Sequence, residues 1–133
     1  MVKRLAGLLF LACAAASVNA STLDDMLKKY QSEGAGPFSA ASGEKFWHTD
    51  HPDPKDPAKI RNCSTCHGKD LTKKGKHVRT GKVIDPMAPS VNKERFTKEK
   101  TIKKWFKRNC KWVLGRECTP QEKGDVLSYL RKQ

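Results

Sequence analysis

Five consecutive residues limit the fold of this chain more than any other feature, and they read Cys63-Ser64-Thr65-Cys66-His67. In this C-x-x-C-H pattern the two thiols can form thioether bonds with the vinyl groups of a haem, while the adjacent imidazole reaches the iron. A redox dithiol would follow a strand in a thioredoxin-like pattern, and a zinc site would need a second pair of ligands. The sequence offers neither context. We therefore predict one covalent haem c per chain, attached to Cys63 and Cys66, with His67 as the proximal iron ligand.

Length and composition agree with a cofactor at the centre of the fold. The chain has 133 residues, which limits it to one small domain and excludes multidomain enzymes. Only 37% of the residues are hydrophobic, which is little for a self-sufficient core of this size. A haem would supply the missing apolar body, around which a polar chain can bury its few aromatic side chains.

The first twenty residues have the composition of a signal peptide. Lys3 and Arg4 precede an apolar run, and Val18-Asn19-Ala20 supplies the small residues that signal peptidase requires. The run is too short to span a bilayer, and lipidation at Cys13 fits its pattern poorly. We predict that residues 1–20 are a signal peptide that is removed, that residues 21–133 form a monohaem cytochrome c domain, and that the product is periplasmic.

Two predicted helices at opposite ends of this domain suggest how it closes. Residues 38–47 form one, in which Gly43 leaves room for a close neighbour. The other begins with a capping box at residues 119–122, which has proline at the first helical position. We also expect a short helix near Leu23, capped by Thr22. First and last helices that cross at a glycine are typical of a small class I cytochrome c-like fold, so we predict an all-α fold of this type wrapped around the haem. The apolar face of the last helix consists of Val126, Leu127 and Leu130, with Tyr129 beside it.

The segments on either side of the haem motif have no helical periodicity. Residues 48–56 are rich in proline and aspartate and are predicted to be an irregular loop. Residues 69–92 contain several glycines and prolines and are predicted to be a loop that wraps the haem. In this second loop Arg79 and Lys82 are candidates for contacts with the haem propionates. Both are explained equally well as ordinary surface charges in contact with water.

The sixth iron ligand decides the function, because it sets both the redox potential and the access of other ligands. Met87 is the usual candidate, since a methionine on a loop after C-x-x-C-H is the common distal ligand of an electron-carrying cytochrome c. A methionine between prolines can also simply pack. His48, His51 and His77 lie in polar surroundings, and we interpret each as a surface histidine.

Helical periodicity adds a less common candidate. Thr97 is a predicted N-cap, and the helix that follows has Ile102, Trp105 and Phe106 on one stripe. Asn109 continues this stripe, so its amide should point into the apolar interior, where it needs a partner. Iron is one possible partner, and local backbone near the end of the helix is the other.

The two remaining cysteines of the domain are Cys110 and Cys118, and no histidine nearby suggests a metal site. A disulfide is the expected state in an oxidising compartment, and it would fix the backbone next to Asn109. Such a bond is also a common staple of small secreted domains and needs no ligand to explain it.

Several stretches together resemble a known family: Arg79-Thr80-Gly81-Lys82, Pro86-Met87-Ala88-Pro89-Ser90, Arg108-Asn109-Cys110, and Leu114-Gly115-Arg116-Glu117-Cys118-Thr119 followed by Glu122-Lys123. They are similar to the oxygen-binding monohaem cytochromes c called sphaeroides haem protein. The resemblance implies that Asn109 is the distal ligand and leaves on reduction, that Cys110 pairs with Cys118, and that ferrous haem then binds oxygen or nitric oxide. It also implies electron transfer from a dihaem cytochrome c. With this resemblance included, Asn109 is favoured over Met87 as the distal ligand.

The charge of the chain favours an acidic redox partner. The formal charge is +13, and many of the cations surround the predicted helix that carries Asn109. A solvated helix face is the simpler interpretation, but a field of this sign also speeds encounter with acidic proteins. Nucleic acid does not fit an exported protein, and contact with a membrane surface would be transient at most.

Three function classes therefore remain open. The first is a redox-coupled cytochrome that binds a diatomic gas, and the second is a plain electron carrier with His67 and Met87 as permanent ligands. The third is a reductase of oxygen, peroxide or nitrogen oxides, for which the sequence supplies no evident general acid or base. We favour the first and leave enzymatic turnover undecided.

Overall fold

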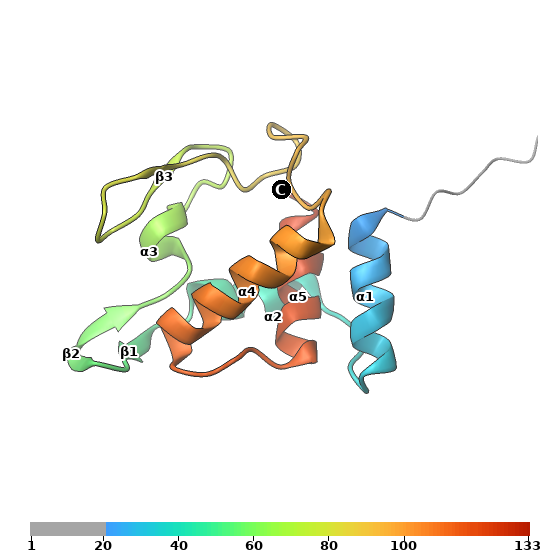
Figure 1. Cartoon of the computed structure of the whole chain (residues 1–133), viewed down its shortest axis with the longest axis horizontal. Helices are drawn as coiled ribbons and strands as arrows, with labels where there is room; N and C mark the ends of the chain where they lie inside the picture. Colours follow the sequence, from blue (N-terminus) through green and yellow to red (C-terminus); the bar gives the residue numbers. More distant parts are fainter. Residues whose placement is uncertain (1–20) are drawn as a thin grey trace, which may run out of the picture.

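The computed structural model describes residues 21–133, so the predicted signal peptide lies outside the described residues. This part of the chain is mostly helical and contains two small antiparallel sheets (Figure 1). Its helices are α1 (Thr22–Ser32), α2 (Ala40–His48), α3 (Ser64–His67), α4 (Glu99–Leu114) and α5 (Pro120–Leu130). Its strands are β1 (His51–Asp53), β2 (Asp56–Arg61), β3 (Gly75–Lys76) and β4 (Val83–Ile84). No helix within residues 21–133 is long and apolar enough to cross a membrane.

Helices α2 and α5 cross in direct backbone contact, as the glycine pattern predicted. A Cβ atom on Gly43 would overlap the backbone carbonyl of Asp125, so only glycine permits this approach. Gly124 is equally close to the ring of Phe38. The crossing is also hydrogen-bonded, because Ser39 N donates to the buried carboxylate of Asp125 at 2.7 Å.

The predicted capping box at the start of α5 is present. Glu122 N donates to Thr119 Oγ1 at 3.1 Å, and Thr119 N donates to the Glu122 carboxylate at 2.8 Å. Arg116 pairs with the same carboxylate at 2.7 Å and lowers the pKa of Glu122. The start of α5 is thus fixed by side chains from the turn that precedes it.

Three predicted helix starts were displaced by one or two residues. The N-cap of α1 is Ser21 rather than Thr22, because the Ser21 hydroxyl accepts from Asp24 N. Thr22 donates instead to the carbonyl of Thr97, which ties α1 to the segment before α4. The N-cap of α4 is Lys98 rather than Thr97, since the Thr97 hydroxyl donates back to Glu94 O. The helix predicted over residues 38–47 is α2, which begins after its cap at Ser39.

The core consists of two clusters that meet at α5. One unites α2 and α5 with the loop after the haem motif, and the other places α1 and α4 against α5. Leu127, which is fully buried, belongs to the second cluster. The members of the first cluster are Trp47, Leu71, Ala88, Val126, Tyr129 and Leu130, and those of the second are Leu23, Met26, Tyr30, Ile102 and Leu127.

The prediction of an irregular loop at residues 48–56 was wrong in part, because this segment begins a β-hairpin. Strands β1 and β2 pair antiparallel, with Pro52 opposite Ile60. Proline is compatible with this sheet because both strands of a two-stranded sheet are edges, so one side of each needs no N–H donor. The buried carboxylate of Asp53 pairs with Arg61 across the hairpin. The loop predicted at residues 69–92 is irregular except for the short strands β3 and β4.

Candidate haem site

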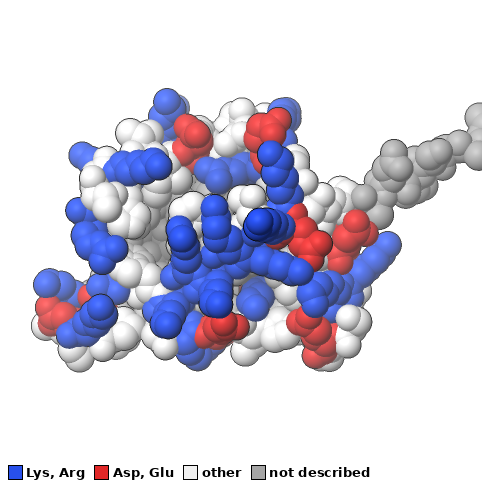
Figure 2. All heavy atoms as spheres, viewed as in Figure 1, with Lys and Arg blue, Asp and Glu red and all other residues white. Residues whose placement is uncertain are grey.

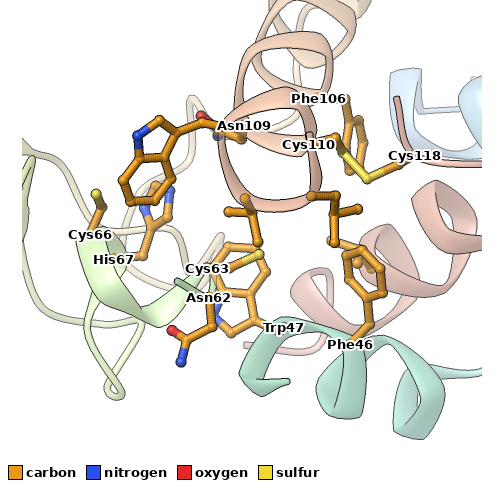
Figure 3. Close-up of a pocket in the computed structure, with 14 residues that line it drawn as sticks. Phe46, Trp47, Asn62, Cys63, Cys66, His67, Phe106, Asn109, Cys110 and Cys118 are labelled. Atoms are coloured by element: carbon orange, nitrogen blue, oxygen red, sulfur yellow. A yellow bond between two sulfur atoms is a disulfide. The ribbon is translucent and has the colours of Figure 1, made fainter. Parts of the chain in front are cut away.

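An open pocket lies between the haem motif and the helices α2, α4 and α5. Figure 3 shows the side chains that surround it, most of which are apolar or sulfur-containing. Helix α2 contributes Phe46 and Trp47, and α5 contributes Val126. The motif and α4 contribute most of the rest: Cys63, Cys66, His67, Phe106, Asn109, Cys110, Trp112, Val113 and Leu114.

The haem motif is held as a single helical turn. Cys63 N donates to Trp47 O at 3.2 Å, and Thr65 N donates to the side chain of Asn62 at 2.9 Å. Residues three and four apart lie on one helix face, so the turn places Cys63, Cys66 and His67 on the same side. All three line the pocket.

Burial sets the protonation state of the motif. It lowers the pKa of His67 to about 4, with a smaller contribution from the charge of Arg95, so the imidazole is neutral at pH 7 and able to bind a metal. Burial also raises the pKa of the Cys63 thiol to about 12, so this thiol is uncharged. Neither Cys63 nor Cys66 is in a disulfide.

Two buried nitrogen atoms in the wall of the pocket are without a hydrogen-bond partner among residues 21–133. They are His67 Nδ1 and Trp47 Nε1, whose rings lie 5.3 Å apart. Unpaired buried polar groups are costly, and a group bound in the pocket is one explanation for them. Two free thiols, a neutral imidazole and apolar walls form the donor set that haem c requires, so the residues present fit this cofactor.

Asn109 lies in the same pocket as His67. Its side chain projects from α4 toward the side where Cys66 and His67 lie (Figure 3). Within the described part of the chain its amide has no hydrogen bond to another residue. The competing candidate, Met87, is not among the residues that line the pocket and packs instead against the core cluster that contains Trp47 and Leu71.

The three histidines interpreted as surface residues are also outside the pocket wall. His48 Nδ1 lies 2.8 Å from Ser64 Oγ, and His77 Nδ1 accepts from the backbone N–H groups of Arg79 and Thr80. His51 is partly buried, and its Nε2 has no partner among the described residues.

Arg79 and Lys82 are not brought to the pocket. Both side chains are exposed, and both lie in the connection between β3 and β4. Their contact with haem propionates therefore stays a prediction.

Trp105 does not belong to the apolar stripe to which it was assigned. It is 44% exposed and lies between the cations of Lys104 and Arg108, which approach its ring at 5.1 and 5.6 Å. Ile102 and Phe106 do face the interior, together with Cys110 and Val113 on the following turns. The prediction that the Asn109 side chain points into the apolar interior was wrong, because Asn109 is exposed. It lies at the edge of this face, from which it still lines the pocket.

Cys110 and Cys118 form the predicted disulfide, with their Cα atoms 5.6 Å apart. The bond joins the last turn of α4 to the residue before the cap of α5 (Figure 3). Both cysteines are buried, and both line the pocket.

Trp47 and Trp112 are pocket residues that sequence reasoning did not single out. Trp112 lies three residues after Asn109 on the same helix, and this spacing was the available signal for it. Trp47 was assigned only to a helix, and nothing in its local pattern separates a core residue from one that faces a cofactor.

Comparison with known proteins gives three consistent similarities. Residues 33–130 match the family model DUF1924, whose description is a domain of unknown function. The chain is 51% identical over 72 residues to the cytochrome c-type protein SHP of Cereibacter sphaeroides, a match that covers 54% of this chain and about half (55%) of that relative. It is 33% identical over 130 residues to cytochrome c'' of Methylophilus methylotrophus, covering 93% of this chain and 88% of the relative.

Two solved structures have the same fold. One is oxidized SHP, described as an oxygen-binding cytochrome c, with 37% identity and a TM-score of 0.75 over 85% of this chain and 98% of that one. The other is oxidized cytochrome c'' from Methylophilus methylotrophus, with 29% identity and a TM-score of 0.72 over 84% of this chain and 94% of that one. These similarities and the helical crossing agree on the predicted class I cytochrome c-like fold.

Proposed function

We propose a function from the premise that this chain belongs to the DUF1924 family and to the family of c-type cytochromes that includes SHP and cytochrome c''. Its cofactor is covalently attached haem c, as in those relatives. The proposed function is redox-coupled gas binding in the periplasm: Asn109 occupies the distal side of the oxidised haem and leaves on reduction, and oxygen or nitric oxide then binds. The protein takes part in electron transfer through the same haem.

One observation carries this proposal. Asn109 lines the same pocket as His67, whereas Met87 is not among the residues that line it. The similarity to a solved structure described as an oxygen-binding cytochrome c supports the gas-binding part of the proposal.

The residues of the motif have separate roles in it. Cys63 and Cys66 would hold the cofactor through two thioether bonds, and His67 would bind the iron through its neutral imidazole. The haem supplies a redox-active iron with one exchangeable position. Asn109 offers an uncharged amide oxygen, which is a hard, weak ligand suited better to ferric than to ferrous iron, so reduction favours its departure. Once released, its N–H₂ group remains in the pocket as a hydrogen-bond donor for a bound gas.

The proposed redox partner is an acidic protein such as a dihaem cytochrome c. Figure 2 shows Lys and Arg side chains gathered over the face on which α4 lies. The exposed cations of this helix and its cap are Lys98, Lys100, Lys103, Lys104, Lys107, Arg108 and Lys111. A field of this sign steers acidic partners toward the helix that carries Asn109.

The test is a set of anaerobic absorption spectra of the purified haem protein, oxidised and then reduced, before and after addition of carbon monoxide. We expect a low-spin ferric form that becomes high-spin on reduction and binds carbon monoxide at once. Asn109→Ala should make the ferric form high-spin as well, because its sixth position is left to water. Met87→Leu is the matched control and should keep the spectra of the unmodified protein.

A ferrous form that stays low-spin and ignores carbon monoxide would contradict the proposal. It would favour a plain electron carrier with a permanent distal ligand, and loss of that behaviour in Met87→Leu would identify the ligand. Consumption of oxygen, peroxide or nitrogen oxides over many turnovers would instead indicate a reductase.

A further inference from the structure

The side chain of Arg61 fastens the hairpin β1–β2 to the end of α4. Its guanidinium carbon lies 4.1 Å from the ring centroid of Trp112, and its Nη1 donates to the backbone carbonyl of the same tryptophan at 2.9 Å. Its Nη2 pairs with the buried carboxylate of Asp53. The guanidinium is therefore held on three sides: by a ring, a carbonyl and a carboxylate.

The carboxylate of Asp53, which pairs with Arg61, is itself held in place. Asp53 Oδ1 accepts from Lys55 N at 2.8 Å, so the carboxylate is oriented by the turn of the hairpin. The same turn packs against the end of α4, where a Cβ atom on Gly115 would lie 3.1 Å from the ring of Pro54. The hairpin thus holds both the side chain of Trp112 and the C-cap of the helix that carries it.

Trp112 connects this fastening to the haem pocket. It lines the pocket together with Asn109, and the two residues lie three apart on α4, which makes them neighbours on the helix surface. An indole fixed there limits the space beside the amide. Asp53 compensates the charge of Arg61. The contact between Arg61 and Trp112 therefore fixes the position of the indole and adds no unpaired positive charge near the haem.

We propose that Arg61 and Trp112 are positioning residues of the distal pocket: Arg61 holds the indole of Trp112 as a wall beside Asn109 and so limits both the release of the amide and the entry of a gas. This inference rests on the proposed function. A planar, permanently charged guanidinium suits the role, because it can stack on the ring while its N–H groups bind carbonyl and carboxylate.

The experiment compares three variants of the haem protein with the unmodified chain. Arg61→Gln removes the cation and the stacking, and Trp112→Phe keeps an aromatic ring but shortens the wall. Lys59→Gln is the matched control, since Lys59 lies on the same strand and pairs only with the exposed carboxylate of Asp56. The readouts are carbon monoxide rebinding after photolysis, the ferric spin state, and the near-UV circular dichroism of the indoles.

We expect carbon monoxide to bind about two- to thirtyfold faster in Arg61→Gln. Loss of the cation–π contact shifts the equilibrium between the held and the displaced indole of Trp112 by about this factor, and the gas enters when the indole is displaced. The same variant should show a larger high-spin fraction in the ferric state and weaker indole dichroism. Trp112→Phe should speed carbon monoxide binding without loss of the fold, and Lys59→Gln should match the unmodified protein in all three readouts.

Two results would overturn the inference, and they differ in what else they affect. If the unmodified ferrous protein binds carbon monoxide but Arg61→Gln and Trp112→Phe bind it at the same rate with an unchanged ferric spectrum, Arg61 has only a structural role, even if its loss lowers stability. If the unmodified protein does not bind carbon monoxide at all, the proposed function fails together with the inference.

Discussion

Gly43 is a residue at which the fold leaves no room for a side chain. It has no side chain, and the carbonyl of Asp125 occupies the space that a Cβ atom would need. Burial of Trp47, one turn further along α2, depends on this approach, because Trp47 packs in one cluster with Val126 and Leu130 of α5. A single missing methyl group thus allows the aromatic wall of the haem pocket to form.

We expect Gly43→Ala to lower the free energy of unfolding by about 1–3 kcal/mol, the usual cost of an overpacked contact. The reason is that α5 must move away from α2 to admit the methyl group. Urea unfolding followed by far-UV circular dichroism measures this change. Glu44→Ala, on the exposed side of the same helical turn, is the control and should change stability by less than about 0.5 kcal/mol. Equal stability of both variants would show that the crossing is not tightly packed in solution.

Individual residues of the candidate site could be predicted where a pattern has a fixed chemical meaning. The C-x-x-C-H motif has such a meaning, whereas periodicity predicted that Asn109 points into the interior and the structure has it exposed at the edge of the pocket. Periodicity could not separate Trp105 from Trp112, which lie seven residues apart on the same edge of α4. Only the neighbouring chain distinguishes them, because Arg61 from the hairpin holds one and the other lies between cations of its own helix.

At the scale of elements, α4 is held at both ends of its last turn. The disulfide from Cys110 ties it to the start of α5, and the hairpin contacts it through Arg61 and Pro54. Asn109 directly precedes Cys110, so the amide is attached to a helix end that has little freedom to move. A ligand that detaches on reduction must then leave mainly by side-chain rotation.

Replacing Cys110 and Cys118 together by serine should lower the free energy of unfolding by about 2–3 kcal/mol, the chain-entropy value for so short a loop. It should also raise the high-spin fraction of the ferric protein, because the backbone beside Asn109 gains freedom. Urea unfolding and ferric absorption spectra measure the two effects. Treatment of the unmodified protein with a thiol reductant, followed by alkylation, should reproduce both. A destabilised variant with an unchanged ferric spectrum would mean that the disulfide is a staple with no effect on the ligand.

The helices could be predicted from sequence because caps, glycines and apolar periodicity are local signals. The hairpin could not, because its prolines and aspartates are typical of loops, and its pairing depends on a buried ion pair between Asp53 and Arg61 and on contact with α4. Helix starts were wrong by one or two residues where several hydroxyl residues compete for the same cap, as at Ser21 and Thr22.

At the scale of the whole molecule, charge is distributed unevenly. The chain carries a formal charge of +13, and much of the positive charge of the described residues gathers over α4. The exposed cations and the pocket that contains Asn109 thus belong to the same helix. An electron donor attracted by this field would arrive close to the haem.

Reduction by the dithionite anion should therefore slow as salt is added, while reduction by the one-electron-reduced methyl viologen radical cation should speed up, each by up to about tenfold between low and high ionic strength. Stopped-flow absorbance at the haem band measures both rates. Lys100→Gln combined with Lys107→Gln on α4 should flatten both salt dependences more than Lys28→Gln combined with Lys132→Gln, which removes the same charge elsewhere. Identical slopes for the two double variants would show that net charge alone governs the encounter.

The crossing of α2 with α5 also has a consequence for the order of events during maturation. Ser39 and Asp125, which are hydrogen-bonded at this crossing, are 86 residues apart, and the loop that they close contains Cys63, Cys66 and His67. Closing so long a loop is slow compared with forming a helical turn, so the motif stays open to an incoming haem while the rest of the chain is still unpaired. Once α5 has docked, Cys63 and Cys66 are partly buried in the wall of the pocket. Chain topology thus favours attachment of the cofactor before the crossing of α2 with α5 has closed.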